Sequence, residues 1–272
     1  MAIVGGGPGG LMTAYLLQKS ANRPLDVTVF EATERLGGKI LTPTFRTAPV
    51  KYEAGAAEFY DYSPVDDDRL KELVDELELP ISRMGGNSVA LDGEILGHLD
   101  DVERICGPEV RRSLLRFHWA ARSQLSPIEF FNLGGPEAPP RVSTAARFDK
   151  FLDAIDDPLA RTHVETLIHS DLATEPEQTS VDYGLQNYLM NDPAYMQLYG
   201  IDGGNEQLPR RLASRIVANF SLRRSVTEIG AGESGRVRVT SRATAKPNST
   251  TETRVTADEF DYVVLALPHD AL

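Results

Sequence analysis

Residues 1–10 read MAIVGGGPGG, and this short stretch decides the fold. Residues 2–4 are an apolar run typical of a strand, and the glycines between Gly5 and Gly10 fit the spacing G-x-G-x-x-G. A helix is predicted directly afterwards, over residues 11–19. In this context the glycines permit a tight turn and let backbone N–H groups approach a pyrophosphate at the helix N-terminus, where the helix dipole favours an anion. Taken alone, the motif also fits a glycine-rich turn that binds no ligand.

The next segment supplies a carboxylate where a bound dinucleotide needs one. Residues 26–31 have the β-branched content of a second strand, which completes a βαβ unit of roughly thirty residues. Glu31 ends this strand about twenty residues after the glycines, where a carboxylate accepts hydrogen bonds from a ribose 2′-hydroxyl. An acid at this position repels a 2′-phosphate and counts against NADP. The alternative is a solvated carboxylate at a strand end, which is the weaker interpretation beside the glycines and both strands.

Composition excludes several classes of partner. The 272 residues carry a formal net charge of −12, so nucleic acid and anionic membrane surfaces are poor partners. Cys106 is the only cysteine, which excludes an intrachain disulfide and suits a reducing compartment. We find no signal peptide and no apolar stretch of bilayer length, so we expect a cytoplasmic protein without a membrane segment. The acidic run 66–68 favours a helix N-cap over metal ligands, and no metal site is expected.

The predicted elements place α/β segments at both ends of the chain and helices in the middle. An amphipathic helix is predicted over residues 68–79, and Asp92-Gly93 is typical of a two-residue hairpin turn. The middle is predicted to be helical over residues 109–124, 147–155, 158–170 and 182–190. The late part is predicted to hold strands at 196–201, 225–229, 236–241 and 263–267, with a helix at 207–220.

The segment after the second strand indicates which dinucleotide is bound. Residues 31–39, Glu-Ala-Thr-Glu-Arg-Leu-Gly-Gly-Lys, resemble the signature of the flavin-dependent amine oxidase family, which includes monoamine, polyamine and L-amino-acid oxidases. The resemblance implies FAD as the cofactor. An arginine such as Arg35 can pair with the second phosphate, and Gly37-Gly38 lets the chain pass beside it without a Cβ clash. The alternative, that Arg35 and Lys39 are only surface cations, is the poorer interpretation.

Three further stretches resemble this family in the expected order. Residues 53–59 resemble the segment that passes the flavin ring, and Gly203-Gly204 resembles a later glycine element. Residues 225–229 and the strand closing at Pro268 resemble a region in which the backbone of a valine, here Val226, contacts the adenine. The residues that the resemblance implies for cofactor binding are Gly5, Gly7, Pro8, Gly9, Gly10, Glu31, Ala32, Arg35, Gly37, Gly38, Lys39, Gly55, Ala56, Ala57, Glu58 and Val226.

The resemblance implies an α/β protein with two domains. A discontinuous Rossmann-like FAD-binding domain would use residues 1–62 and 200–272, and a mostly helical substrate domain would use residues 63–199. The implied activity is oxidation of an amine or amino-acid-like substrate by hydride transfer to flavin, with an imine as product and O2 as reoxidant. A desaturase or protoporphyrinogen-oxidase-like enzyme would share every motif quoted. A flavin-binding subunit without catalysis of its own is the other alternative.

Glu58 is a departure from the family pattern. Family members that oxidise amino acids often carry an arginine near this position, and a glutamate cannot bind a substrate carboxylate. We hypothesise that Glu58 lies near the flavin ring and substrate; capping of backbone N–H groups is an equal alternative. The catalytic residues are otherwise unknown. His118 and His169 lack convincing ligand partners, and the aromatic residues Phe117, Trp119, Phe130 and Phe131 are more typical of a core than of a substrate site.

The last apolar run lies unusually close to the end of the sequence. Residues 263–267, Val-Val-Leu-Ala-Leu, predict a strand buried on both faces in the middle of a sheet. In the resembling family this strand lies about two-thirds of the way along the protein, and the C-terminal third of the fold comes after it. Half a flavin site would expose large apolar surfaces. We therefore expect that a second polypeptide completes the fold as a heteromer, or that the sequence belongs to a longer chain.

Overall fold

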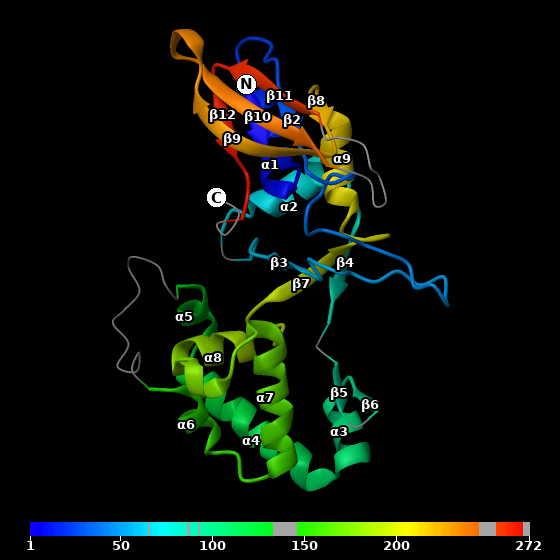
Figure 1. Cartoon of the computed structure of the whole chain (residues 1–272). Helices are drawn as coiled ribbons and strands as arrows, with labels where there is room; N and C mark the ends of the chain where they lie inside the picture. The colour runs from blue at the N-terminus through cyan, green and yellow to red at the C-terminus, as the bar shows by residue number, and fades with distance from the viewer. Residues whose placement is uncertain (65, 86–87, 92, 133–145, 245–253, 269–272) are drawn as a thin grey trace. The chain divides into compact units, whose positions relative to one another are not determined.

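The structure of the chain is a computed structural model that describes residues 1–64, 66–85, 88–91, 93–132, 146–244 and 254–268 (Figure 1). The described chain divides into two units. The first unit comprises Met1–Phe59, Arg69–Ser82 and Gly200–Leu272, and the second comprises Tyr60–Asp68 and Arg83–Tyr199. Compared with the domain bounds expected from sequence, the segment Arg69–Ser82 belongs with the first unit.

A parallel sheet forms the centre of the first unit. Its strands are β1 (Ala2–Val4), β2 (Thr28–Phe30), β8 (Asn219–Ser221) and β12 (Val263–Leu265), in the order β12-β1-β2-β8. β1 is paired on both sides, with Ile3 opposite Val29 and opposite Val264, and its three side chains are buried. This burial on both faces explains the uniformly apolar run at the start of the chain.

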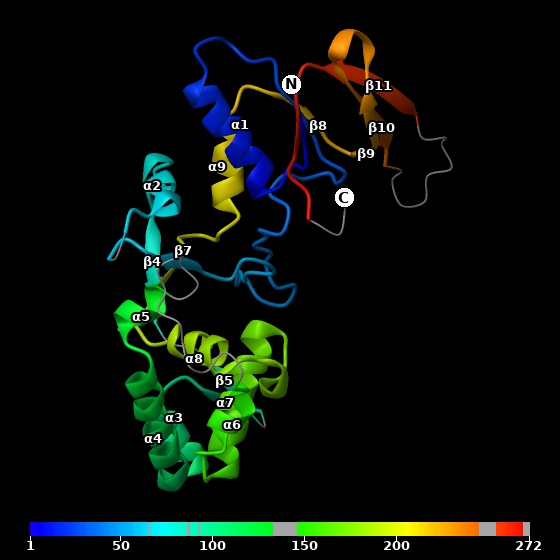
Figure 2. The same ribbon diagram turned by 90° about the vertical axis from the view of Figure 1, so that its left-hand side faces the viewer.

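Three helices belong to the same unit. α1 (Pro8–Ser20) connects β1 to β2 as the crossover, and α9 (Gln207–Arg215) lies beside it (Figure 2). α2 (Arg69–Glu76) is tied to α1 at its surface, because the Glu76 carboxylate accepts a hydrogen bond from Tyr15 Oη at 2.7 Å and pairs with Lys19. The predicted βαβ unit is therefore present, with the helix starting at Pro8, a residue suited to a first helical position.

An antiparallel sheet packs against the parallel one. It consists of β9 (Arg224–Ala231), β10 (Val237–Ala243) and β11 (Val255–Phe260), in the order β11-β10-β9, with a short 3₁₀ turn η2 at Glu233–Gly235. Phe260 meets Phe30 edge to face, with ring centroids 5.9 Å apart. Side chains alternate along β10, the strand predicted over residues 236–241, with Val239 buried and Arg238 exposed. β11 was not predicted, because its polar residues give no apolar run; its partner β10 supplies the pairing.

Two late elements differ from the sequence prediction. The helix predicted over residues 207–220 ends at Arg215, because residues 219–221 pair in parallel with β2 as strand β8. The strand predicted over residues 263–267 to be buried on both faces is an edge strand within the described chain, pairs only with β1, and leaves Leu265 48% exposed. An apolar run indicates a strand, but it does not tell which neighbours will pair with it.

The second unit is mostly helical, as predicted. Its helices are α3 (Leu99–Cys106), α4 (Pro108–Gln124), α5 (Pro127–Phe131), α6 (Phe148–Leu152), α7 (Pro158–Leu172) and α8 (Val181–Leu189), with a 3₁₀ turn η1 at Pro176–Gln178. Side-chain caps fix several starts: Asp157 Oδ1 accepts from the Ala160 N–H at 3.0 Å, and Ser180 Oγ accepts from the Tyr183 N–H. The predicted hairpin is β5 (Val89–Leu91) with β6 (Glu94–Leu96), while Asp92 lies outside the described residues.

The predicted core interpretation of the aromatic residues is only partly right. Phe117 and Phe130 are buried in the main apolar cluster of the second unit, and Phe131 packs against it. Trp119 is 63% exposed, with the Arg122 guanidinium 5.3 Å from its ring centroid. The boundaries between the two units fall in β3 (Phe59–Asp61), β4 (Ile81–Met84) and β7 (Gln197–Ile201), a sheet in the order β3-β7-β4.

Candidate functional site

The three glycines of the motif have two different roles in the structure. Gly5 has a φ of +110°, and a Cβ there would lie 2.3 Å from the Ala266 carbonyl oxygen. Gly10 faces Gly5 across the strand–helix turn, where a Cβ would lie 1.9 Å from the Gly5 carbonyl oxygen. Gly7 has an ordinary φ of −74°, and a Cβ there would meet nothing closer than 3.7 Å. Gly5 and Gly10 therefore let the turn close, while Gly7 leaves backbone accessible to a ligand.

The N-terminus of α1 is suited to an anion. Gly7 is the N-cap residue and supplies no side chain to cap the first turn, so within the described chain the first N–H groups of α1 have no side-chain cap. The unpaired N–H groups and the helix dipole place partial positive charge at this end. A pyrophosphate is the group that such a glycine loop accommodates.

Glu31 is held firmly at the end of β2. Its Oε2 accepts a hydrogen bond from the Gly6 N–H at 2.9 Å, and its Oε1 accepts from the Thr33 N–H at 2.8 Å. A carboxylate has about four acceptor positions, so two such bonds leave capacity for the hydroxyl groups of a ribose. The backbone carbonyl of Glu31 also accepts from the Arg224 N–H at 2.9 Å, which ties the start of β9 to this strand end.

These elements surround a cavity of about 590 Å³ in the first unit. Its lining includes nine of the residues predicted from sequence: Gly5, Gly7, Pro8, Gly9, Glu31, Ala32, Gly38, Lys39 and Val226. It also includes Arg224, Ser225 and the segment Ala266–Pro268, which the sequence prediction did not name as site residues. Arg224 could have been noticed as a cation next to the predicted adenine-side strand. The Ala266–Pro268 segment joins the site because β12 pairs with β1 in parallel and ends at the same sheet edge.

The remaining predicted residues lie elsewhere in the described structure. Gly10 packs inside the turn, and Gly37, with a φ of +107°, packs against Pro209 of α9. Arg35 is directed at its own turn: its guanidinium donates to the Ile40 carbonyl at 3.3 Å and to the carbonyls of Leu36 and Gly38. Arg35 therefore shapes the turn that carries Gly38 and Lys39.

The predicted flavin-ring segment is fixed by a buried asparagine that the sequence prediction missed. Asn205 is 1% exposed, and its Nδ2 donates to the carbonyls of Ala56 and Ala57 at 2.9 and 3.2 Å. Its Oδ1 accepts from the Ile201 N–H, and its own N–H donates to Glu53 Oε1, both at 2.9 Å. A signal was present, because Asn205 directly follows Gly203-Gly204.

The segment around Gly55 also packs closely against the backbone of residues 39–42. A Cβ on Gly55 would lie 1.6 Å from the Lys39 carbonyl oxygen, so only glycine fits there. Thr42 links the same layers, donating from Oγ1 to Glu53 Oε2 at 2.7 Å and accepting from the Glu206 N–H. Glu58 comes next in the chain as a half-buried residue with interactions of its own, outside the cavity lining.

The donor set of the cavity fits the nucleotide half of FAD. The uncapped start of α1 suits the pyrophosphate, Lys39 and Arg224 add positive charge to the lining of the cavity, and Glu31 retains acceptor capacity for a ribose. The open face of Gly7 provides room that a Cβ would occupy. The fold and the cavity together define a dinucleotide-binding α/β protein.

Comparison with known proteins identifies the family. The family of flavin containing amine oxidoreductases matches residues 8–272, and the chain belongs to it. This membership confirms the flavin cofactor FAD that the sequence predicted, and it confirms the amine oxidase resemblance. No curated protein matches the chain.

Solved structures share the fold. A redesigned variant of putrescine oxidase matches with a TM-score of 0.63 and 24% identity, over 98% of this chain and 57% of that chain. A putative protoporphyrinogen oxidase from Exiguobacterium sp. 255-15 has a TM-score of 0.58 at 20% identity, over 99% and 59%. Cyclohexylamine oxidase from Brevibacterium oxydans IH-35A has a TM-score of 0.56 at 20% identity, over 98% and 57%. The α/β Rossmann-like fold is thus confirmed.

The chain spans 57–59% of the length of these solved structures. Nothing in the comparisons supports a second polypeptide, which stays a prediction. None of the helices in the described residues is both long and apolar enough to cross a membrane.

Proposed function

We propose that the protein oxidises an amine or amino-acid-like substrate at the carbon that bears the nitrogen. The observation that carries the proposal is the glycine-lined cavity at the start of α1, in a chain of the amine oxidoreductase family. When bound, FAD supplies the redox chemistry by accepting a hydride from that carbon, and O2 then reoxidises it. The product is an imine, which water hydrolyses.

The residues of the chain bind and orient the cofactor. The first N–H groups of α1 hold the pyrophosphate, with Lys39 providing charge, and Glu31 accepts hydrogen bonds from the ribose. The backbone of Val226 contacts the adenine at the start of β9. Asn205 holds the carbonyls of Ala56 and Ala57 in place, so the segment that carries Glu58 keeps one conformation beside the ring.

Glu58 has the role that distinguishes this chain from oxidases of amino acids. A carboxylate near the ring attracts a cation or a hydroxyl and disfavours a substrate carboxylate. We therefore favour an amine over an amino acid as the substrate. This assignment rests on the position of Glu58 directly after the segment that Asn205 fixes.

A second candidate is the oxidation of a carbon–carbon bond in an apolar substrate, as in a desaturase or a protoporphyrinogen-oxidase-like enzyme. An uncharged, aromatic cavity in the second unit favours it, because such a lining also accepts a substrate without nitrogen. A flavin-binding subunit without catalysis is the third alternative.

Anaerobic mixing decides among these functions. The FAD-loaded protein is mixed with a panel of amines and, separately, with apolar polyenes, and loss of the oxidised flavin absorbance is followed. Bleaching by amines, with peroxide release once oxygen is admitted, supports the proposal. Bleaching by polyenes alone supports the second candidate. If no compound bleaches the flavin while FAD is bound in full, the non-catalytic subunit is the remaining function.

A further inference from the structure

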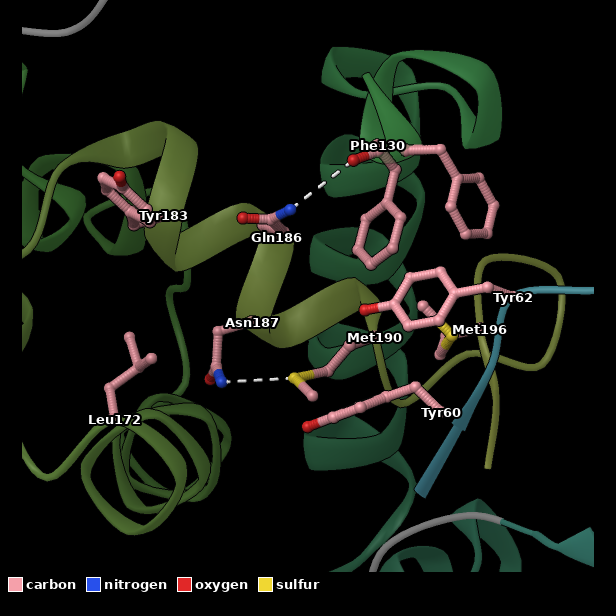
Figure 3. A pocket seen from close by; sticks show the side chains of 10 residues that line it. Tyr60, Tyr62, Phe130, Leu172, Tyr183, Gln186, Asn187, Met190 and Met196 are labelled. Carbon is pink, nitrogen blue, oxygen red and sulfur yellow. Dashed lines mark hydrogen bonds between the residues drawn. The ribbon is translucent and has the colours of Figure 1, made fainter. Parts of the chain in front are cut away.

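The second unit contains a cavity of its own, of about 330 Å³ (Figure 3). Ten described residues line it; five are aromatic, two are methionines, and none carries a charge. Nothing in the proposed cofactor site uses this cavity. Its size and its uncharged, largely aromatic lining are typical of a site for a small organic molecule.

Aromatic rings form one wall of the cavity. The ring centroids of Tyr60 and Tyr62 are 6.3 Å apart, and those of Tyr62 and Phe131 are 6.4 Å apart. Phe130 meets Phe131 edge to face with centroids at 5.3 Å. Such a wall favours contact with a flat ring or an aliphatic body.

One polar group in the cavity lacks a full set of partners. Asn187, on α8, is 6% exposed, and its buried Oδ1 has no hydrogen-bond partner among the residues that the structure describes. Its Nδ2 donates to Met190 Sδ at 3.4 Å, and sulfur is a weak acceptor. The neighbouring amide of Gln186 differs, since it donates to the Phe130 carbonyl (Figure 3). Reversing the Asn187 amide would only move the deficit to its nitrogen.

The Asn187 amide therefore favours a ligand with a hydroxyl-type group. Met190, which covers the amide through its sulfur, is unbranched and flexible and can give way to a ligand. A hydroxyl both donates and accepts, so it satisfies either orientation of the amide. Buried polar groups in proteins are almost always paired, and the deficit here indicates a partner that binds.

If the ligand is an amine, as the proposed function has it, the uncharged lining disfavours a second charged group at the end of the ligand opposite the amine. A distal ammonium would find ring faces but no carboxylate among the ten lining residues, and attraction to rings is weaker than the penalty of removing an unpaired charge from water. A distal carboxylate would find no cation among the same ten residues and would meet the negative faces of the rings.

We propose that this cavity binds the body of a monoamine, an apolar or ring-containing group that carries a hydroxyl opposite the amine, and that it selects against diamines and amino acids. That the ligand is an amine rests on the proposed function. That a charged group opposite the amine is disfavoured rests on the cavity alone.

A matched ligand series tests the proposal. The probes are benzylamine and its derivatives with hydroxymethyl, aminomethyl or carboxylate groups at the opposite ring carbon, so only the distal group changes. Binding to the FAD-loaded protein is measured by calorimetry, and flavin bleaching is followed separately. We expect the hydroxymethyl compound to bind about fivefold tighter than benzylamine, the worth of one hydrogen bond, and both charged compounds to bind at least tenfold more weakly.

Two variants assign the selectivity to Asn187. Asn187→Leu, of similar volume, should abolish the fivefold preference for the hydroxymethyl compound over benzylamine. Gln186→Leu is the control on the same helix, because its amide already has a partner, and it should keep the preference. If Asn187→Leu does not fold, the ranking of the four probes on the unmodified protein decides.

The outcomes separate this proposal from the proposed function. Tight binding of the diamine or the carboxylate, or a hydroxymethyl preference that survives in Asn187→Leu, overturns the assignment of the cavity. Binding in the expected order without flavin bleaching supports the cavity and overturns amine oxidation. Bleaching by all four amines without the expected order of affinity supports amine oxidation and overturns the cavity.

Discussion

Replacing Gly7 by alanine should weaken FAD binding without destabilising the fold, and replacing Gly10 by alanine should mainly destabilise the fold. The two glycines are three residues apart in one motif, yet an added methyl group meets different surroundings at each. At Gly7 the nearest atom would be the Gly38 Cα at 3.7 Å, an ordinary contact, and the residue lines the cavity. At Gly10 the nearest atom would be the Gly5 carbonyl oxygen at 1.9 Å.

The magnitudes follow from these distances. In Gly10→Ala the Cβ–oxygen separation must grow from 1.9 Å to at least 3.0 Å. Because the tight turn between β1 and α1 holds the Gly5 carbonyl against the first turn of the helix, the overpacking penalty is about 3 kcal/mol. The better helix propensity of alanine returns about 1 kcal/mol, which leaves a net loss of about 2 kcal/mol. In Gly7→Ala, a small loss at the N-cap and a small gain from a stiffer unfolded chain cancel to within about 0.5 kcal/mol.

FAD affinity should respond in the opposite order to stability, with the larger loss in Gly7→Ala. The methyl group of Gly7→Ala occupies the face where backbone approaches the pyrophosphate, and we expect FAD to bind at least about tenfold more weakly, or about 1.4 kcal/mol. Gly10→Ala should lower FAD affinity only as far as it disturbs the turn.

Two measurements on each variant decide the matter. Urea unfolding of the FAD-free protein reports stability, and titration of the FAD-free protein with FAD reports affinity. The reasoning is refuted if Gly7→Ala binds FAD like the unmodified protein, or if Gly10→Ala unfolds at the same urea concentration as the unmodified protein.

Four further predictions address single residues. Glu31→Gln should weaken FAD binding about tenfold, because a charged acceptor for the ribose becomes a neutral one; unchanged affinity in an FAD titration would contradict its role. Asn205→Ala should lower the free energy of unfolding by about 3 kcal/mol in urea, since it leaves two carbonyls and one N–H without their partner. Asn205→Asp should lose at least as much, because it buries a carboxylate against the carbonyl oxygens of Ala56 and Ala57. Glu58→Gln should change flavin affinity or substrate kinetics, and the hypothesis for Glu58 fails if stopped-flow kinetics and FAD titration both match the unmodified protein. Burial holds the pKa of His163 below its ordinary value of 6.5, so the unfolded chain binds the proton more readily and stability should fall as pH drops below about 6.5; a His163→Gln variant whose urea midpoint shows the same fall would exclude this cause.

The sequence alone predicted the βαβ unit that carries the glycine turn. The G-x-G-x-x-G spacing and Glu31 are local features whose geometry is imposed within a single βαβ unit. The structure of residues 1–31 could therefore be predicted without knowledge of the rest of the chain. The helical character of the middle was also readable, because amphipathic periods and proline-bearing loops are local signals.

Contacts between distant segments had to come from the tertiary structure. Strand β8 was predicted as the end of a helix, and its pairing with β2, about 190 residues earlier, overrode the local preference. The terminal strand was predicted in the middle of a sheet and lies at the edge of the described one, yet its end lines the cofactor cavity because it pairs with β1.

Asn205 and Asn187 show the same limit. Asn205 follows the Gly203-Gly204 element and Asn187 lies in a predicted helix, but neither position by itself shows that the side chain is buried. Packing places the buried Asn205 side chain where it bonds the backbone of Ala56, Ala57 and Ile201. Packing also leaves the Asn187 side-chain carbonyl without a partner among the described residues, in a cavity with an uncharged lining. The sequence determined the glycine turn and the place of Glu31 at the end of β2, because short-range backbone geometry suffices for that. The tertiary structure decided which side chains became polar anchors, because desolvation depends on what the rest of the chain packs around them.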